Sequence, residues 1–141
     1  MSTEQNIALV RRFVQEVMNK GDLAAMDEFF PVDVVDHTPE VPNLPPGREG
    51  AKILFAAYRA AFPDYHVAID DILAEGDKVV WRWTLTGTNQ GSMMGMPATG
   101  KQVKVEGIDI FRIADGKIVE RWASFDQLGM MQQLGAVPAP G

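Results

Sequence analysis

The sequence predicts an α+β fold in which N-terminal helices pack on a curved antiparallel sheet. Apolar residues recur at helical spacing before Pro63, and they alternate with polar residues from Tyr65 onward. Helices followed by a run of strands favour a layer of helices on one sheet, and a curled sheet would enclose a pocket. The 141 residues fit one domain, which we place at 1–136 with a short tail at 137–141.

The helical region carries its own start and stop signals. Ser2 with Gln5 three residues later is typical of a capping box, and Gly21 suits the end of the helix that begins there. Asp22 can cap a short second helix. Five prolines within 31–47 predict an irregular loop, and a third helix follows it.

The remaining chain reads as strands joined by tight turns. We expect strands at 65–75, 78–88, 103–113 and 117–126, and a terminal helix at 127–134. The dipeptide Asp115-Gly116 is a strong signal for a two-residue hairpin, which pairs Ala114 with Lys117. Continued without interruption, this register places Asp109 opposite Trp122, with Asp126 on the same face.

Composition and charge exclude several classes of protein. The chain has no cysteine, so disulfides and thiolate sites are absent, and its two histidines lack the spacing of a metal-binding helix, so we expect no metal. A net charge of −6 without any basic cluster argues against nucleic acid and anionic membranes as partners. No apolar run approaches the roughly 18 residues of a membrane span. The first residues do not resemble a secretory signal, and we expect a cytoplasmic protein.

Asp109 stands out within the predicted sheet. The other odd-numbered positions of 103–113 are apolar or glycine, so Asp109 points with the apolar set. A carboxylate there loses hydration and must find a partner or shift its pKa upward, as catalytic acid–base groups do. The alternative is a structural buried carboxylate that accepts a hydrogen bond from the Trp122 indole or from a helix side chain.

Short motifs follow one another along nearly the whole chain. They are Asp36-His37-x-Pro39, Phe62-Pro63-Asp64, Gly87-x3-Gly91-x3-Gly95-x-Pro97-x-Thr99-Gly100-Lys101, Asp115-Gly116-Lys117-Ile118, Trp122-x3-Asp126 and Gln133-Leu134-Gly135. In this order and spacing they resemble the SnoaL-like polyketide cyclases (ester cyclases) of the NTF2-like superfamily. The resemblance implies a cone-shaped α+β barrel, a homodimer, an apolar or aromatic small-molecule ligand and no cofactor.

The resemblance also suggests roles for single residues. In these cyclases an Asp that follows the last-strand Trp is the general acid–base group, and Asp126 matches that position. With Asp126, the expected catalytic residues are His37 and Asp109, and either His37 or Asp109 would orient the substrate oxygen. The expected substrate-binding residues are Trp122, Asn89, Met94 and Phe111. The alternatives are that Asp126 only caps the terminal helix and that His37 is a loop histidine bonded to the backbone.

The functional hypothesis is a cofactor-independent enzyme that closes a ring in an apolar carbonyl compound by an intramolecular aldol reaction. Asp126 would remove a proton from a carbon flanked by carbonyls and later return it to the alkoxide. The same pocket could serve an isomerase or a hydrolase, since a pocket carboxylate can equally activate water. A non-catalytic module for small-ligand binding or dimerisation is the alternative from another class.

Overall fold

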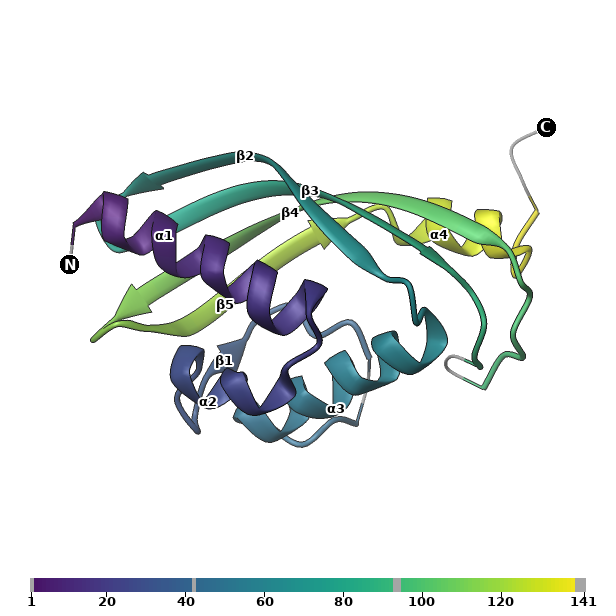
Figure 1. Cartoon of the computed structure of the whole chain (residues 1–141), viewed down its shortest axis with the longest axis horizontal. Coiled ribbons are helices and arrows are strands. Elements are labelled where there is room, and N and C mark those ends of the chain that lie inside the picture. The colour runs from purple at the N-terminus through teal and green to yellow at the C-terminus, as the bar shows by residue number, and fades with distance from the viewer. Residues whose placement is uncertain (1, 42, 93–94, 139–141) are drawn as a thin grey trace.

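The helices cover one face of a curved five-stranded sheet, which is the α+β arrangement expected from the sequence (Figure 1). The structure is a computed structural model that describes residues 2–41, 43–92 and 95–138. The helical elements are α1 (Thr3–Phe13), η1 (Val14–Asn19), η2 (Leu23–Ala25), α2 (Met26–Phe29), α3 (Gly47–Ala61) and α4 (Gln127–Leu134). The strands β1 (Val35–Asp36), β2 (His66–Glu75), β3 (Lys78–Thr88), β4 (Gln102–Ala114) and β5 (Lys117–Phe125) lie in the order β1-β5-β4-β3-β2.

The predicted helix signals act as expected. The Ser2 Oγ accepts from the Gln5 backbone N–H at 3.1 Å, and the Gln5 side chain accepts from the Ser2 N–H at 2.9 Å, which completes the capping box. Asp22 caps η2 through the Ala25 N–H at 3.3 Å. No helix in the described ranges is long and apolar enough to cross a membrane.

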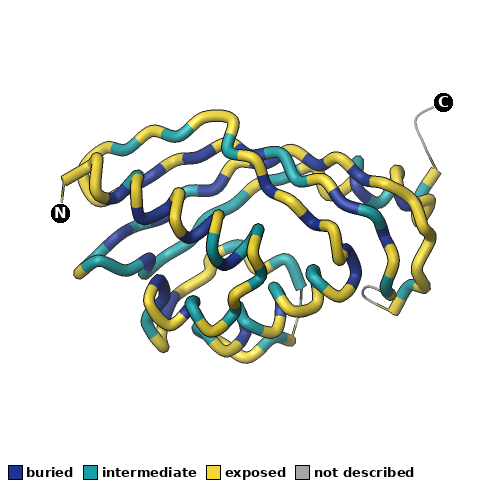
Figure 2. The backbone as a smooth tube through the Cα atoms, in the orientation of Figure 1, coloured by how far each residue is buried: buried dark blue, intermediate teal, exposed yellow. Residues whose placement is uncertain are grey.

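The core lies between α1 and the concave face of the sheet. Alternate residues of β3 and β4 are buried, a pattern that is visible along both strands in Figure 2. The largest buried side chains include Phe13, Phe29, Phe62, Trp81 and Phe111. Asp109 faces this apolar side, as the alternation predicted.

The register between β4 and β5 corrects one expectation. Ala114 pairs with Lys117 as predicted, but the pairing shifts between Arg112 and Ile113, and Val119 has no partner in the ladder. Such a bulge inserts one extra residue and turns every later side chain of that strand to the other face. The predicted pairing of Asp109 with Trp122 is therefore wrong.

Beyond the bulge, each side chain of β5 lies on the opposite face of the sheet from the one predicted. Asp109 pairs with Ala123, and Trp122 pairs with Ile110. Trp122 consequently lies on the outer face of the sheet, whereas Arg121 lies on the concave face beside Asp109.

The segment predicted as an irregular loop contains a short strand. β1 pairs in parallel with β5, with Val35 opposite Glu120 and Asp36 opposite Arg121. Beyond β1 the backbone N–H of His37 donates to the Arg121 carbonyl at 2.9 Å. These contacts hold the proline-rich segment against the edge of β5, so its carboxylates lie near the concave face.

Candidate functional site

A cavity lies between the concave sheet face and the helices. The space free of protein atoms measures about 970 Å³ and includes a part that is open to solvent. Its aromatic lining comprises Phe13, Phe30, Phe55, Tyr58, Phe62, Tyr65, Trp81, Trp83, Phe111 and Phe125. Polar side chains line one end, namely Asp36, Glu40, Asp109 and Arg121. Apolar walls with a few convergent polar groups are typical of a small-molecule site.

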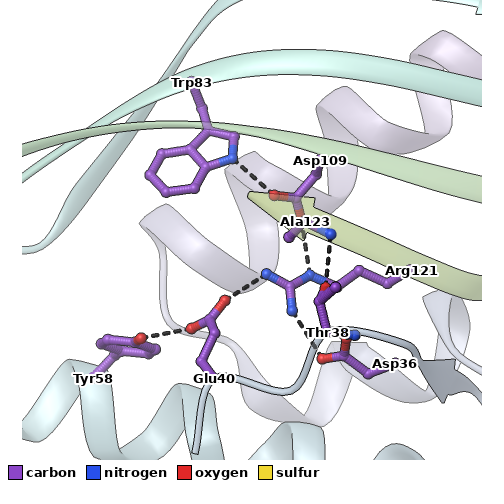
Figure 3. A network of polar contacts seen from close by, with 8 residues as sticks. All are labelled: Asp36, Thr38, Glu40, Tyr58, Trp83, Asp109, Arg121 and Ala123. Carbon is purple, nitrogen blue, oxygen red and sulfur yellow. Dashed lines mark hydrogen bonds and ion pairs between the residues drawn. The ribbon is translucent and has the colours of Figure 1, made fainter. Parts of the chain in front are cut away.

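Asp109 is the most deeply buried carboxylate at the polar end, with 4% of its surface exposed. The Trp83 Nε1–H donates to its Oδ1 at 2.9 Å, and the Arg121 Nε–H donates to its Oδ2 at 2.9 Å (Figure 3). Burial raises the pKa of Asp109 above its ordinary value of 3.8, and this effect outweighs the lowering by Arg121 and Trp83. Asp109 is therefore a stronger base than an exposed aspartate.

Arg121 joins three carboxylates. Besides Asp109, its guanidinium donates to Asp36 at 2.8 Å and to Glu40 at 2.5 Å. Burial lowers the pKa of Arg121, but the charges of these carboxylates outweigh burial and raise it above its ordinary value. The guanidinium thus remains positively charged and fixes the geometry of the cluster.

Tyr58 connects this cluster to α3. Its hydroxyl donates to the Glu40 Oε2 at 2.6 Å. Burial, together with the charge of Glu40, raises the pKa of Tyr58, so the phenol keeps its proton. Within the described part of the chain, no three His, Cys, Asp or Glu side chains form a group that could hold a metal ion.

Asp126 does not lie in the cavity, and the prediction that it shares the concave face with Asp109 and Trp122 is wrong. It follows the last residue of β5, is exposed, and accepts the Gly129 N–H at 2.8 Å on its Oδ1. This is the N-cap of α4, the alternative considered for this residue. The assignment of acid–base chemistry to Asp126 has no geometric support.

His37 and Trp122 lie together on the outer face of the sheet. Their rings stack with centroids 4.6 Å apart, and the His37 Nε2 lies 2.7 Å from the Glu120 Oε2. Neither side chain lines the cavity, so neither can contact a ligand there. The bulge in β5 is the physical reason, because it turns Trp122 away from Asp109.

The other expected substrate-binding residues have different surroundings. Phe111 lines the cavity. Asn89 is buried outside it and holds the 89–101 loop, because it accepts from the Thr99 N–H at 2.9 Å and donates to the Gly91 carbonyl at 2.8 Å. Met94 lies outside the described residues, so its role stays a prediction.

Sequence reasoning missed the partners of Asp109. Arg121 could have been found from its charge, because a buried carboxylate is stabilised by a cation. A one-residue insertion in β5 turns the Arg121 side chain to the inner face of the sheet, beside Asp109. Arg121, Ala123 and Phe125 then share the inner face. Glu40 carried no such signal, since nothing in a proline-rich segment indicates which side chain turns inward.

Comparison with known proteins agrees with this architecture. The aklanonic acid methyl ester cyclase DnrD of Streptomyces peucetius is 34% identical over 140 residues, covering 96% of this chain and 92% of the relative. The aklanonic acid methyl ester cyclase DauD of Streptomyces sp. (strain C5) is 34% identical over 134 residues, or 92% and 81% of the two chains. The solved structure of TsrD from Streptomyces laurentii superposes with a TM-score of 0.88 at 31% identity, over 97% of this chain and 99% of that one.

The family model described as SnoaL-like polyketide cyclase matches residues 8–134, which is most of the chain. The match includes β1, α3 and all four long strands, and so every side chain of the polar end described above. The chain therefore belongs to the SnoaL-like polyketide cyclase family.

Proposed function

We propose that this protein is a cofactor-independent cyclase that closes a ring in an apolar polyketide-like substrate, with Asp109 as its acid–base group. The observation that carries the proposal is a buried carboxylate at the polar end of an otherwise apolar cavity. Two relatives bear the name aklanonic acid methyl ester cyclase, which supports cyclisation as the reaction class. Asp109 replaces Asp126 in this role because, of these two residues, Asp109 lines the cavity and Asp126 does not.

The reaction is an intramolecular aldol addition. Asp109 takes a proton from a carbon that lies between two carbonyls, and the electron pair of that C–H bond forms an enolate. The enolate carbon attacks a second carbonyl carbon of the same molecule, so a C–C bond forms and the C=O π pair moves to oxygen. The alkoxide then takes the proton back from Asp109. No atom is gained or lost, and no redox partner is needed.

The surroundings of Asp109 suit this cycle. Trp83 and Arg121 each donate to a different carboxylate oxygen, so the orientation of the carboxylate is fixed before the substrate binds. The raised pKa strengthens Asp109 as a base in its ionised form and keeps the protonated form within reach during turnover. The aromatic walls exclude water from the enolate, which would otherwise be protonated before the ring closes.

Aklanonic acid methyl ester is a suitable probe, because two relatives are named for it. We expect a product of unchanged mass in which carbon NMR shows one ketone replaced by a carbinol, with one stereoisomer in excess over the uncatalysed sample. Release of methanol, with a free acid lighter than the substrate by one CH2 group, would indicate a hydrolase. A product of equal mass without a new ring would indicate an isomerase. Binding without turnover would favour the non-catalytic module.

We also propose that the protein forms a homodimer across the outer sheet face. This face exposes Val35, Val80 and Ile108, each between 37% and 46% exposed, and it also carries the stacked His37 and Trp122 rings. It also carries charges of both signs, since Arg112 pairs there with Glu120. A face with apolar side chains and both charges can match a two-fold copy of itself, as isologous dimers require.

The dimer proposal predicts that a charge introduced into the outer sheet face will dissociate the dimer. Wild-type protein should sediment at twice the chain mass of 15.5 kDa at micromolar concentration, and Ile108→Asp should sediment as the monomer. Leu128→Asp is the matched control, because Leu128 is a 62% exposed apolar residue on α4 rather than on the outer sheet face. A monomeric wild type, or equal dissociation by both variants, would contradict the proposal.

A further inference from the structure

Trp81 is a cavity-lining residue with a hydrogen-bond donor that no described residue uses. The side chain lines the cavity, and the residue is 1% exposed. Its Nε1–H is buried without a hydrogen-bond partner among the described residues. The neighbouring indole behaves differently, since the Trp83 Nε1–H donates to Asp109. The Trp83 indole is thus part of the hydrogen-bond network of the protein, whereas the Trp81 indole N–H has no partner among the described residues.

A buried donor without a partner is unfavourable, because the N–H loses its hydration and gains nothing in return. Native proteins leave few such groups, and those that remain call for a specific explanation. Packing alone does not explain Trp81, since a phenylalanine would also fill apolar space against Phe111 without a polar atom. An acceptor on a bound molecule would account for the donor.

We propose that the Trp81 Nε1–H binds a carbonyl oxygen of the ligand and thereby orients it in the cavity. The carboxylates of Asp36, Glu40 and Asp109 cannot serve this purpose, because ionised carboxylates only accept hydrogen bonds. The ligand class is a ring system or chain with a ketone or ester carbonyl flanked by apolar groups. A purely hydrocarbon ligand would leave the donor unpaired.

Trp81 lies close enough to Asp109 for its indole N–H to assist the reaction. This part of the inference rests on the proposed function. Trp81 and Asp109 are directly opposed across β3 and β4, and such partners have Cβ atoms about 4.5–5.5 Å apart. A carbonyl oxygen held by Trp81 would leave its neighbouring acidic carbon near the Asp109 carboxylate. Negative charge that develops on that oxygen during enolate formation would meet the indole N–H.

Indole NMR signals test the contact without any need for turnover. The chain has three tryptophans, so three indole N–H resonances are expected, and Trp83→Phe and Trp122→Phe assign them by elimination. The probes are 1-tetralone and tetralin, which share a bicyclic skeleton and differ in the carbonyl. We expect 1-tetralone to move the Trp81 proton downfield, tetralin to move it much less, and the Trp122 signal to stay in place. Equal shifts with both compounds, or no shift with 1-tetralone, would overturn the proposal.

Affinities provide a second and independent measurement. Trp81→Phe should weaken 1-tetralone binding about tenfold while changing tetralin binding much less, and Trp122→Phe should alter neither. An unchanged ratio of the two affinities in Trp81→Phe would contradict the inference. If that variant does not fold, the wild-type NMR result decides. Failure of the cyclase assay would leave both binding tests valid, so the two proposals can fail separately.

Discussion

Replacement of Asp109 by asparagine is expected to lower the turnover of a cyclisation substrate by about 10²–10⁴-fold. Asparagine keeps the shape of the side chain but cannot take a proton from carbon. Ligand affinity should change far less, because the apolar walls remain in place. Steady-state kinetics combined with direct binding measurements would separate the two effects. The wild-type rate should also fall as the pH drops below the pKa of Asp109, which lies above 3.8, and this acid limb should vanish in Asp109→Asn.

Two variants at positions outside the cavity serve as controls for Asp109→Asn. Asp126→Asn and His37→Ala should keep wild-type turnover, since Asp126 caps α4 and His37 stacks on the outer face. Loss of activity in Asp126→Asn with normal turnover in Asp109→Asn would reverse our assignment. Unchanged turnover in both Asp variants would exclude Asp109 and Asp126 alike as the acid–base group.

Arg121→Met is expected to lower the free energy of unfolding at neutral pH by about 3–5 kcal/mol. The substitution keeps much of the apolar stem but removes the only cation that contacts Asp109, among the described residues. Asp109 and Glu40 would then remain buried without their counter-ion, which is costlier than the loss of one exposed pair. Chemical denaturation at several pH values would measure this loss.

The loss should depend on pH in a defined direction. Without Arg121 the pKa of Asp109 in the folded protein rises further above 3.8, so the folded state binds a proton more tightly than the unfolded state. The free energy of unfolding therefore decreases as the pH rises from about 3.8 to the folded-state pKa. The deficit should be small in acid and reach its full size above the folded-state pKa of Asp109. Arg82→Met, which breaks an exposed pair with Asp71, should show little change at any pH. A pH-independent deficit would exclude this electrostatic cause.

Much of the fold could be predicted because local signals agree with the tertiary structure. Asp115 and Gly116 both adopt positive φ, as a two-residue hairpin with this sequence requires. The alternation in β3 and β4 identified the buried face correctly, including Asp109. β1 escaped prediction because two residues paired in parallel have no periodicity of their own, and their partner in β5 lies about eighty positions away.

The candidate site was harder to predict because it depends on one unpaired residue. Val119 resembles any other strand residue, and no glycine marks the bulge. Without the bulge Trp122 would face the cavity and Arg121 the outer face, which is the arrangement expected from uninterrupted pairing. Charge was the available signal, since an inward Asp109 needs a partner or a raised pKa, and Arg121 is a cation that can reach it only after the register shift.

The polar end of the cavity has more acids than bases, and this imbalance bears on which molecules can enter. Three carboxylates surround the single guanidinium of Arg121. A ligand with its own carboxylate would bring another negative charge into a region where apolar walls weaken screening by solvent. The same ligand with that carboxylate converted to an ester would meet no such repulsion, although its shape would be nearly unchanged. We therefore expect the site to select by electrostatic repulsion as well as by shape, and to favour neutral ligands over anions.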